Sequence, residues 1–153
     1  MARYEHLIFD LDHTLWDFDK NSRLVISSLF KKHNLGQTLK CSLDEYFNVY
    51  TSTTNRLWKL YDEQKIGKES LRKQRLQLVF KHFGKQNREL QQKLEQSYLQ
   101  TCPYSPHLID NALELLKILS GRYSLHILTN GFQNIQTIKV TTTGISKYFK
   151  NIV

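Results

Sequence analysis

Residues 7–15 read Leu-Ile-Phe-Asp-Leu-Asp-His-Thr-Leu, an apolar run that leads into two carboxylates. Branched and aromatic residues favour a β-strand, whose side chains alternate between its faces, so we expect Asp10 and Asp12 to point the same way, opposite to Leu11. Two carboxylates at the end of a buried strand repel each other unless a cation or a shared proton offsets their negative charge. The stretch therefore predicts a divalent-metal site of hard oxygen ligands, with one carboxylate able to attack or to move a proton.

A simpler interpretation of the same residues stays open. Aspartate is common in turns because its carboxylate accepts hydrogen bonds from nearby backbone N–H groups. Asp10 and Asp12 are therefore also consistent with a turn that ends the strand. The pattern of two aspartates around one residue is too short to decide between the two readings by itself.

Composition indicates a folded domain. The 153 residues fit one ordinary domain or one core with a modest insertion, and 40% hydrophobic residues supply a packed interior. No apolar run approaches the roughly 18 residues of a membrane span, and the N-terminus has no signal-peptide pattern. Cys41 and Cys102 form no metal-binding pattern, as is typical of reduced thiols in the cytoplasm. We expect a cytoplasmic protein without a membrane partner.

The net charge of +8 attracts anions, including phosphorylated small molecules. Lysine and arginine are scattered among acidic and amide residues, and no basic arm or RNA-binding aromatic box is present. We therefore expect solvated helix faces and no nucleic-acid partner.

The middle of the chain has helical periodicity. Apolar residues recur at steps of three and four between about residues 20 and 100, which predicts four amphipathic helices in a small bundle. Residues 42–45 read Ser-Leu-Asp-Glu, a capping box that predicts the start of a long helix. A different pattern follows this region.

After residue 103 the pattern alternates between helix and strand. Ser105 followed by Pro106 predicts a helix that ends near Gly121. Residues 123–128 then predict a short strand, 132–140 another helix, and 148–153 the beginning of a further strand. With the strand at residues 7–9, this order predicts a parallel sheet with right-handed crossovers.

Ligands of parallel sheets bind beyond the carboxyl ends of the strands. Asp10 and Asp12 follow one strand and Thr129-Asn130-Gly131 follow another, so we expect these two stretches to meet in space. Thr129 has a hydroxyl, Asn130 a backbone N–H and an amide, and Gly131 an open backbone near a helix start. These groups can cradle a phosphate.

The two stretches together resemble the first and second motifs of the haloacid dehalogenase-like (HAD) superfamily. More closely, residues 10–18, Asn55 with Trp58, and residues 129–132 resemble its pyrimidine 5′-nucleotidase branch. The resemblance implies an α/β fold, with a partial Rossmann-like parallel-sheet core at residues 1–17 and 104–153. Residues 18–103 would form an inserted four-helix cap.

The resemblance also implies a mechanism. Asp10 would be the nucleophile and Asp12 the general acid/base of a Mg²⁺-dependent phosphomonoester hydrolase that forms an aspartyl phosphate. Mg²⁺ would bind the Asp10 carboxylate and the Asp12 backbone carbonyl. Thr129, Asn130 and Gly131 would hold the phosphate of the substrate, which the resemblance to this branch implies is a nucleoside 5′-monophosphate. Trp16, Phe18 and Trp58 are candidates to line the site.

The chain departs from the family pattern after the second motif. Lys139, Lys147 and Lys150 do not stand where the family has its third-motif lysine, and no acidic residue follows Glu114 to complete the metal site. We therefore expect a fragment, whose first strand lies at an exposed sheet edge that another chain could cover. A phosphomutase, and an inactive fragment that serves as a binding module, remain alternative interpretations.

Overall fold

The computed structural model describes residues 4–153. Within them the chain forms two compact units, one containing the residues up to Ser22 together with Thr101–Val153, and the other Arg23–Gln100. The sequence placed these boundaries next to residues 18 and 103. The first boundary of the structure falls a few residues later, because helix α1 (Phe18–Lys32) runs without interruption across it.

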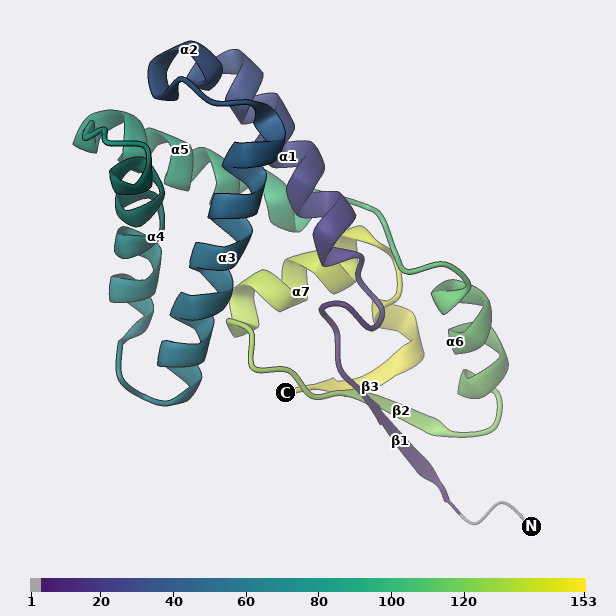
Figure 1. The fold of residues 1–153 in the computed structure, drawn as a ribbon. Helices are drawn as coiled ribbons and strands as arrows, with labels where there is room; N and C mark the ends of the chain where they lie inside the picture. The colour runs from purple at the N-terminus through teal and green to yellow at the C-terminus, as the bar shows by residue number, and fades with distance from the viewer. Residues whose placement is uncertain (1–3) are drawn as a thin grey trace. The chain divides into compact units, whose positions relative to one another are not determined.

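The first unit contains a three-stranded parallel sheet. Strands β1 (His6–Phe9), β2 (Ser124–Ile127) and β3 (Phe149–Ile152) lie side by side in that order (Figure 1). Helix α6 (Ala112–Ser120) precedes β2, and helix α7 (Gln133–Thr142) connects β2 to β3. The predicted α/β fold with a parallel sheet is confirmed.

The two faces of this sheet differ in burial. Leu125 and Ile127 are each 1% exposed, whereas Ile8 on the opposite face is 66% exposed. Parallel strands that are added in one direction through right-handed crossovers place their helices on one face, and α6 and α7 lie on the same side of the strands in Figure 1. Among the described residues β1 pairs only with β2, so it forms an edge of the sheet.

The second unit is helical. It contains most of α1 and four further helices, which are α2 (Leu35–Leu39), α3 (Leu43–Asp62), α4 (Lys68–His82) and α5 (Arg88–Thr101). The sequence predicted four helices and missed the short α2. Ser42 and Glu45 form the predicted capping box at the start of α3. No helix within residues 4–153 is long and apolar enough to cross a membrane.

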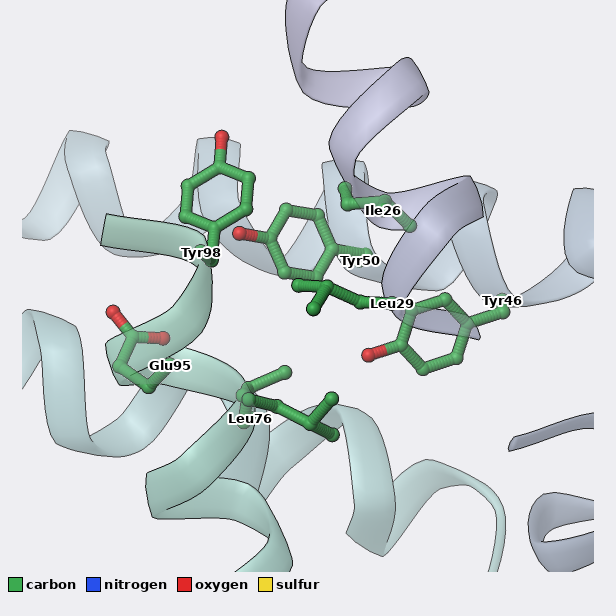
Figure 2. Close-up of a pocket in the computed structure, with 8 residues that line it drawn as sticks. Ile26, Leu29, Tyr46, Tyr50, Leu76, Glu95 and Tyr98 are labelled. Carbon is green, nitrogen blue, oxygen red and sulfur yellow. The ribbon is translucent and has the colours of Figure 1, made fainter. Parts of the chain in front are cut away.

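The interior of the helical unit contains polar groups. Glu95 accepts two hydrogen bonds from the guanidinium of Arg75, including one from Nε at 3.2 Å. Beside Glu95, the rings of Tyr46, Tyr50 and Tyr98 line a small cavity of about 10 Å³ (Figure 2). Burial raises the pKa of the Tyr46 and Tyr50 hydroxyls above the ordinary value of tyrosine.

The helix predicted to start at Ser105 and Pro106 begins later. A short 3₁₀ helix (Cys102–Tyr104) ends before Ser105, and α6 starts only at Ala112. The intervening residues pair with the loop after β1: Leu108 forms an antiparallel bridge with Trp16, whose indole N–H donates to the Ser105 carbonyl at 3.1 Å. This tertiary pairing holds the backbone extended where the local sequence favours a helix. A second 3₁₀ helix (Ser146–Tyr148) precedes β3.

Candidate functional site

The loop after β1 carries both predicted carboxylates. Leu11 is fully buried, and its carbonyl accepts hydrogen bonds from the N–H groups of Leu15 and Trp16, both at 2.9 Å. This tight turn is anchored in the core and leaves Asp10 exposed at the end of the strand. Asp10 Oδ2 accepts a hydrogen bond from the Thr14 hydroxyl at 3.3 Å. The Asp10 carboxylate is therefore placed where a ligand can reach it.

The carboxylate of Asp12 has a different environment. Lys139 Nζ donates to Asp12 Oδ1 at 2.6 Å and to Oδ2 at 2.9 Å, and Gln136 Nε2 donates to Oδ2 at 2.9 Å. The Lys139 side chain is 6% exposed and that of Asp12 is 26% exposed. A nearly buried ammonium is stable only when it is paired, so Lys139 and Asp12 depend on each other.

Gln136 connects Asp12 to the second predicted stretch. Its Nε2 also donates to the Thr129 hydroxyl oxygen at 2.8 Å, and that oxygen accepts a further hydrogen bond from the Gly131 N–H at 3.2 Å. The structure thus brings Asp12, Thr129 and Gly131 together, although Asp12 and Thr129 lie far apart in the sequence. Asn130 lies exposed next to Thr129.

The Gln136 side chain leaves no room for a side chain at position 131, which is occupied by glycine. A Cβ atom at this position would lie 2.1 Å from Gln136 Nε2 and 2.5 Å from its Cδ. Any side chain here would displace the Gln136 amide from Thr129 and Asp12. The glycine therefore allows the helix α7 side chain to reach across the turn that follows β2.

Two aromatic rings lie against the Lys139 ammonium. Nζ lies 4.3 Å from the ring centroid of Trp16 and 5.7 Å from that of Phe18. Trp16 is fully buried, so one side of the ammonium is shielded from water. Of the three aromatic residues predicted to line the site, Trp16 and Phe18 lie beside it, and Trp58 belongs to the helical unit.

Gln136 was not among the residues predicted from the sequence, and Lys139 had no predicted role. Both residues are buried on α7, at 1% and 5% exposure, although each is polar. A polar pair spaced three residues apart lies on one side of a helix, and buried polar residues next to Val140 interrupt an otherwise apolar face. That interruption, immediately after Thr129-Asn130-Gly131, is the signal that could have identified them.

Magnesium is the cation that the predicted chemistry requires, and the donors at this site suit it in part. The Asp10 carboxylate is an exposed hard oxygen ligand, whereas the Asp12 carboxylate is taken up by Lys139 and Gln136. Within residues 4–153 no three His, Cys, Asp or Glu side chains gather as a metal site. Mg²⁺ commonly binds through one or two carboxylates, with water and substrate phosphate as further ligands, so Asp10 and the Asp12 backbone carbonyl fit this mode.

Known proteins resemble the chain over nearly its whole length. The model of the haloacid dehalogenase-like hydrolase family matches residues 7–153. Pyrimidine 5′-nucleotidase PynA of Streptococcus pneumoniae is 31% identical over 150 residues, which cover 97% of this chain and 60% of PynA. YfnB of Bacillus subtilis is 28% identical over 152 residues, which cover 99% of this chain and 62% of YfnB.

A solved structure shows the same similarity. The crystal structure of YfnB bound to magnesium superposes with a TM-score of 0.87 at 27% identity, covering 99% of this chain and 65% of that one. The chain therefore spans about 60% of the length of the curated relatives it matches.

Proposed function

The chain belongs to the haloacid dehalogenase-like hydrolase family, and from this premise we propose that it is a phosphomonoester hydrolase acting on nucleoside 5′-monophosphates through an aspartyl phosphate. One observation carries the proposal. The exposed carboxylate of Asp10 directly follows strand β1, and Asp12 lies two residues further on. Gln136 donates a hydrogen bond to Asp12 and another to Thr129, so it joins the two predicted stretches. The name of PynA, a pyrimidine 5′-nucleotidase, supports the substrate class.

The proposed reaction has two halves. In the first, an Asp10 oxygen attacks phosphorus, the bond from phosphorus to the nucleoside 5′ oxygen breaks, and that oxygen takes a proton from the protonated Asp12 carboxyl. In the second, water attacks the aspartyl phosphate, the bond from phosphorus to Asp10 breaks, and Asp12 takes the proton from the water. The products are a nucleoside and inorganic phosphate.

Other groups would position the substrate. The Thr129 hydroxyl and the backbone at Asn130 and Gly131 lie before the N-terminus of α7 and would bind phosphate oxygens. Mg²⁺, held by Asp10 and the Asp12 backbone carbonyl, would neutralise phosphate charge. Trp16 and Phe18 would exclude water from the side of Asp12 that faces Lys139.

The test measures phosphate release by the 153-residue chain from pyrimidine nucleoside monophosphates, with and without Mg²⁺. Asp10→Asn removes the nucleophile and should lower release at least about 1,000-fold. Asp19→Asn is the matched control, because Asp19 is exposed and lies outside the network of Asp12. Absence of Mg²⁺-dependent release by the wild-type chain would contradict the proposal, and transfer of the phosphoryl group to an added sugar phosphate would indicate a phosphomutase instead.

A further inference from the structure

We propose that Lys139 is a positioning residue, which together with Gln136 fixes the Asp12 carboxylate in the orientation needed to accept a proton from water. This inference rests on the proposed function, because it assigns a partner to the general acid/base. Nothing in the sequence motifs assigns Lys139 this role. It is carried by three features of the structure: the contact geometry, the burial of the ammonium, and its aromatic surroundings.

The contact geometry fixes both carboxylate oxygens. Lys139 Nζ donates to each of them, at 2.6 and 2.9 Å, and Gln136 adds a second donor to Oδ2. All these groups donate to Asp12, so this structure shows its carboxylate as an acceptor, which is its role in the second half of the proposed reaction. An acceptor in a fixed orientation is what the second half of the reaction requires after the nucleoside has left.

Burial restricts where the ammonium can go. Lys139 is 5% exposed and lies against the Trp16 and Phe18 rings, so it has few alternative rotamers in which its charge would be solvated. The partly exposed Asp12, by contrast, can reach water. The two residues are therefore held in different ways. The buried residues around Lys139 fix the position of its ammonium, and the ammonium sets the orientation of the Asp12 carboxylate.

The test compares steady-state kinetics of three variants at one position. Lys139→Met keeps the length and apolar character of the side chain but removes the donor, and we expect kcat to fall about 10- to 100-fold while KM stays within about twofold. Lys139→Arg restores a donor to both oxygens and should recover most of the loss. Lys139→Gln, which retains a neutral donor, should fall between them and covers the case in which Lys139→Met does not fold.

A second readout separates positioning from general damage. If Asp12 is misaligned for the water step, acid quenching during turnover should trap a larger fraction of Lys139→Met than of wild-type protein as the acyl phosphate. Lys150→Met is the matched control, because Lys150 is an exposed lysine on β3. Its kcat and its acyl-phosphate fraction should equal those of the wild-type chain.

The outcomes distinguish failure of this inference from failure of the proposed function. If Asp10→Asn abolishes turnover and Lys139→Met keeps the wild-type kcat, the inference is overturned and the hydrolase remains. If the wild-type chain shows no turnover, the hydrolase proposal fails for this chain, and crystal structures decide the positioning role without substrate. An Asp12 carboxylate that turns away from Gln136 in Lys139→Met supports it, and an unchanged orientation overturns it.

Discussion

Each compact unit of this protein contains a nearly buried basic side chain that is paired with a carboxylate and lies against aromatic rings. In the helical unit Arg75 pairs with Glu95 and lies 5.5 and 5.0 Å from the ring centroids of Tyr50 and Tyr98. In the sheet unit Lys139 pairs with Asp12 beside two aromatic rings. Both cations have side chains that are 6% exposed.

The two ion pairs differ in the exposure of their carboxylates. Glu95 is 14% exposed and accepts a two-pronged contact from a planar guanidinium, which leaves little freedom to either partner. Asp12 is 26% exposed and lies, like Asp10, in the loop after β1. A nearly buried ion pair is therefore not by itself a sign of a functional site. The feature that separates the two is a carboxylate that is held by its partner and still reaches solvent.

The largest effect is expected from Arg75→Met. It leaves the largely buried Glu95 carboxylate without its cation, which should lower the free energy of unfolding by about 3–5 kcal/mol. Lys139→Met should cost less, about 1–2 kcal/mol, because Asp12 can be hydrated. Urea denaturation of both variants measures the difference.

Two further variants test the reason for the Arg75 effect. Adding Glu95→Leu to Arg75→Met removes the stranded charge and should regain most of the lost stability. Arg23→Ala breaks the exposed pair with Asp44 and should cost less than about 1 kcal/mol. Equal losses for Arg75→Met and Lys139→Met would contradict the distinction drawn between the two pairs.

An intermediate effect is expected from Gly131→Ala, which acts on Gln136, the neighbour of the Asp12 pair. The new Cβ would displace Gln136 and break its hydrogen bonds to Asp12 and Thr129, at a cost of about 1–3 kcal/mol. In a Gln136→Ala background the clash is absent, so the same substitution should cost much less. Additive losses in this double-mutant cycle, measured by urea denaturation, would refute the steric explanation.

The smallest effect is expected at Glu45, an exposed carboxylate that accepts hydrogen bonds from Ser42. The Ser42 N–H, followed by the Ser42 hydroxyl, lowers the pKa of Glu45 below its value in the unfolded chain. This contribution to stability is present above the unfolded pKa of about 4.3 and is lost as the pH falls through the lower folded pKa.

Glu45→Gln tests this pH dependence. The variant should have a lower urea midpoint than the wild-type chain at neutral pH, and the difference should shrink on acidification. Glu69→Gln is the control, because Glu69 lies in the first turn of α4, whose N-cap Gly67 has no side-chain hydrogen bond. A difference between Glu45→Gln and wild type that stays constant with pH would show that the capping box does not act through the charge.

Local patterns predicted much of the fold. The alternation around β2 and the capping box at Ser42 correspond to elements of the structure, because each depends on residues within a few positions. The parallel sheet followed from the order of helices and strands. Asp12 and Thr129 both follow the carboxyl ends of parallel strands, where ligands of such sheets bind, and Gln136 joins them by hydrogen bonds.

The remaining features depend on contacts between distant segments. Ser105 and Pro106 favour a helix start, yet pairing of this segment with Trp16 keeps it extended. The contact between Lys139 and Asp12 depends on which face of α7 meets the loop after β1, and the polar pair on α7 shows that this face is unusual without showing what it meets. Gly131 was predicted to offer an open backbone to a phosphate, and its close approach to the Gln136 amide is a further reason for a glycine, which no local pattern indicates.

The insertion of the helical unit between β1 and β2 has a consequence for the order of folding. His6 pairs with Ser124 across the whole insertion, and closing such a long loop costs chain entropy that local helix contacts do not require. We therefore expect the helical unit to become compact first, and Asp12 to meet Lys139 in a late step. The two tryptophans report on the two events separately, because Trp58 belongs to the helical unit and Trp16 to the sheet unit. In refolding of single-tryptophan variants, the fluorescence of Trp58 should reach its final value before that of Trp16, and the reverse order would refute this sequence of events.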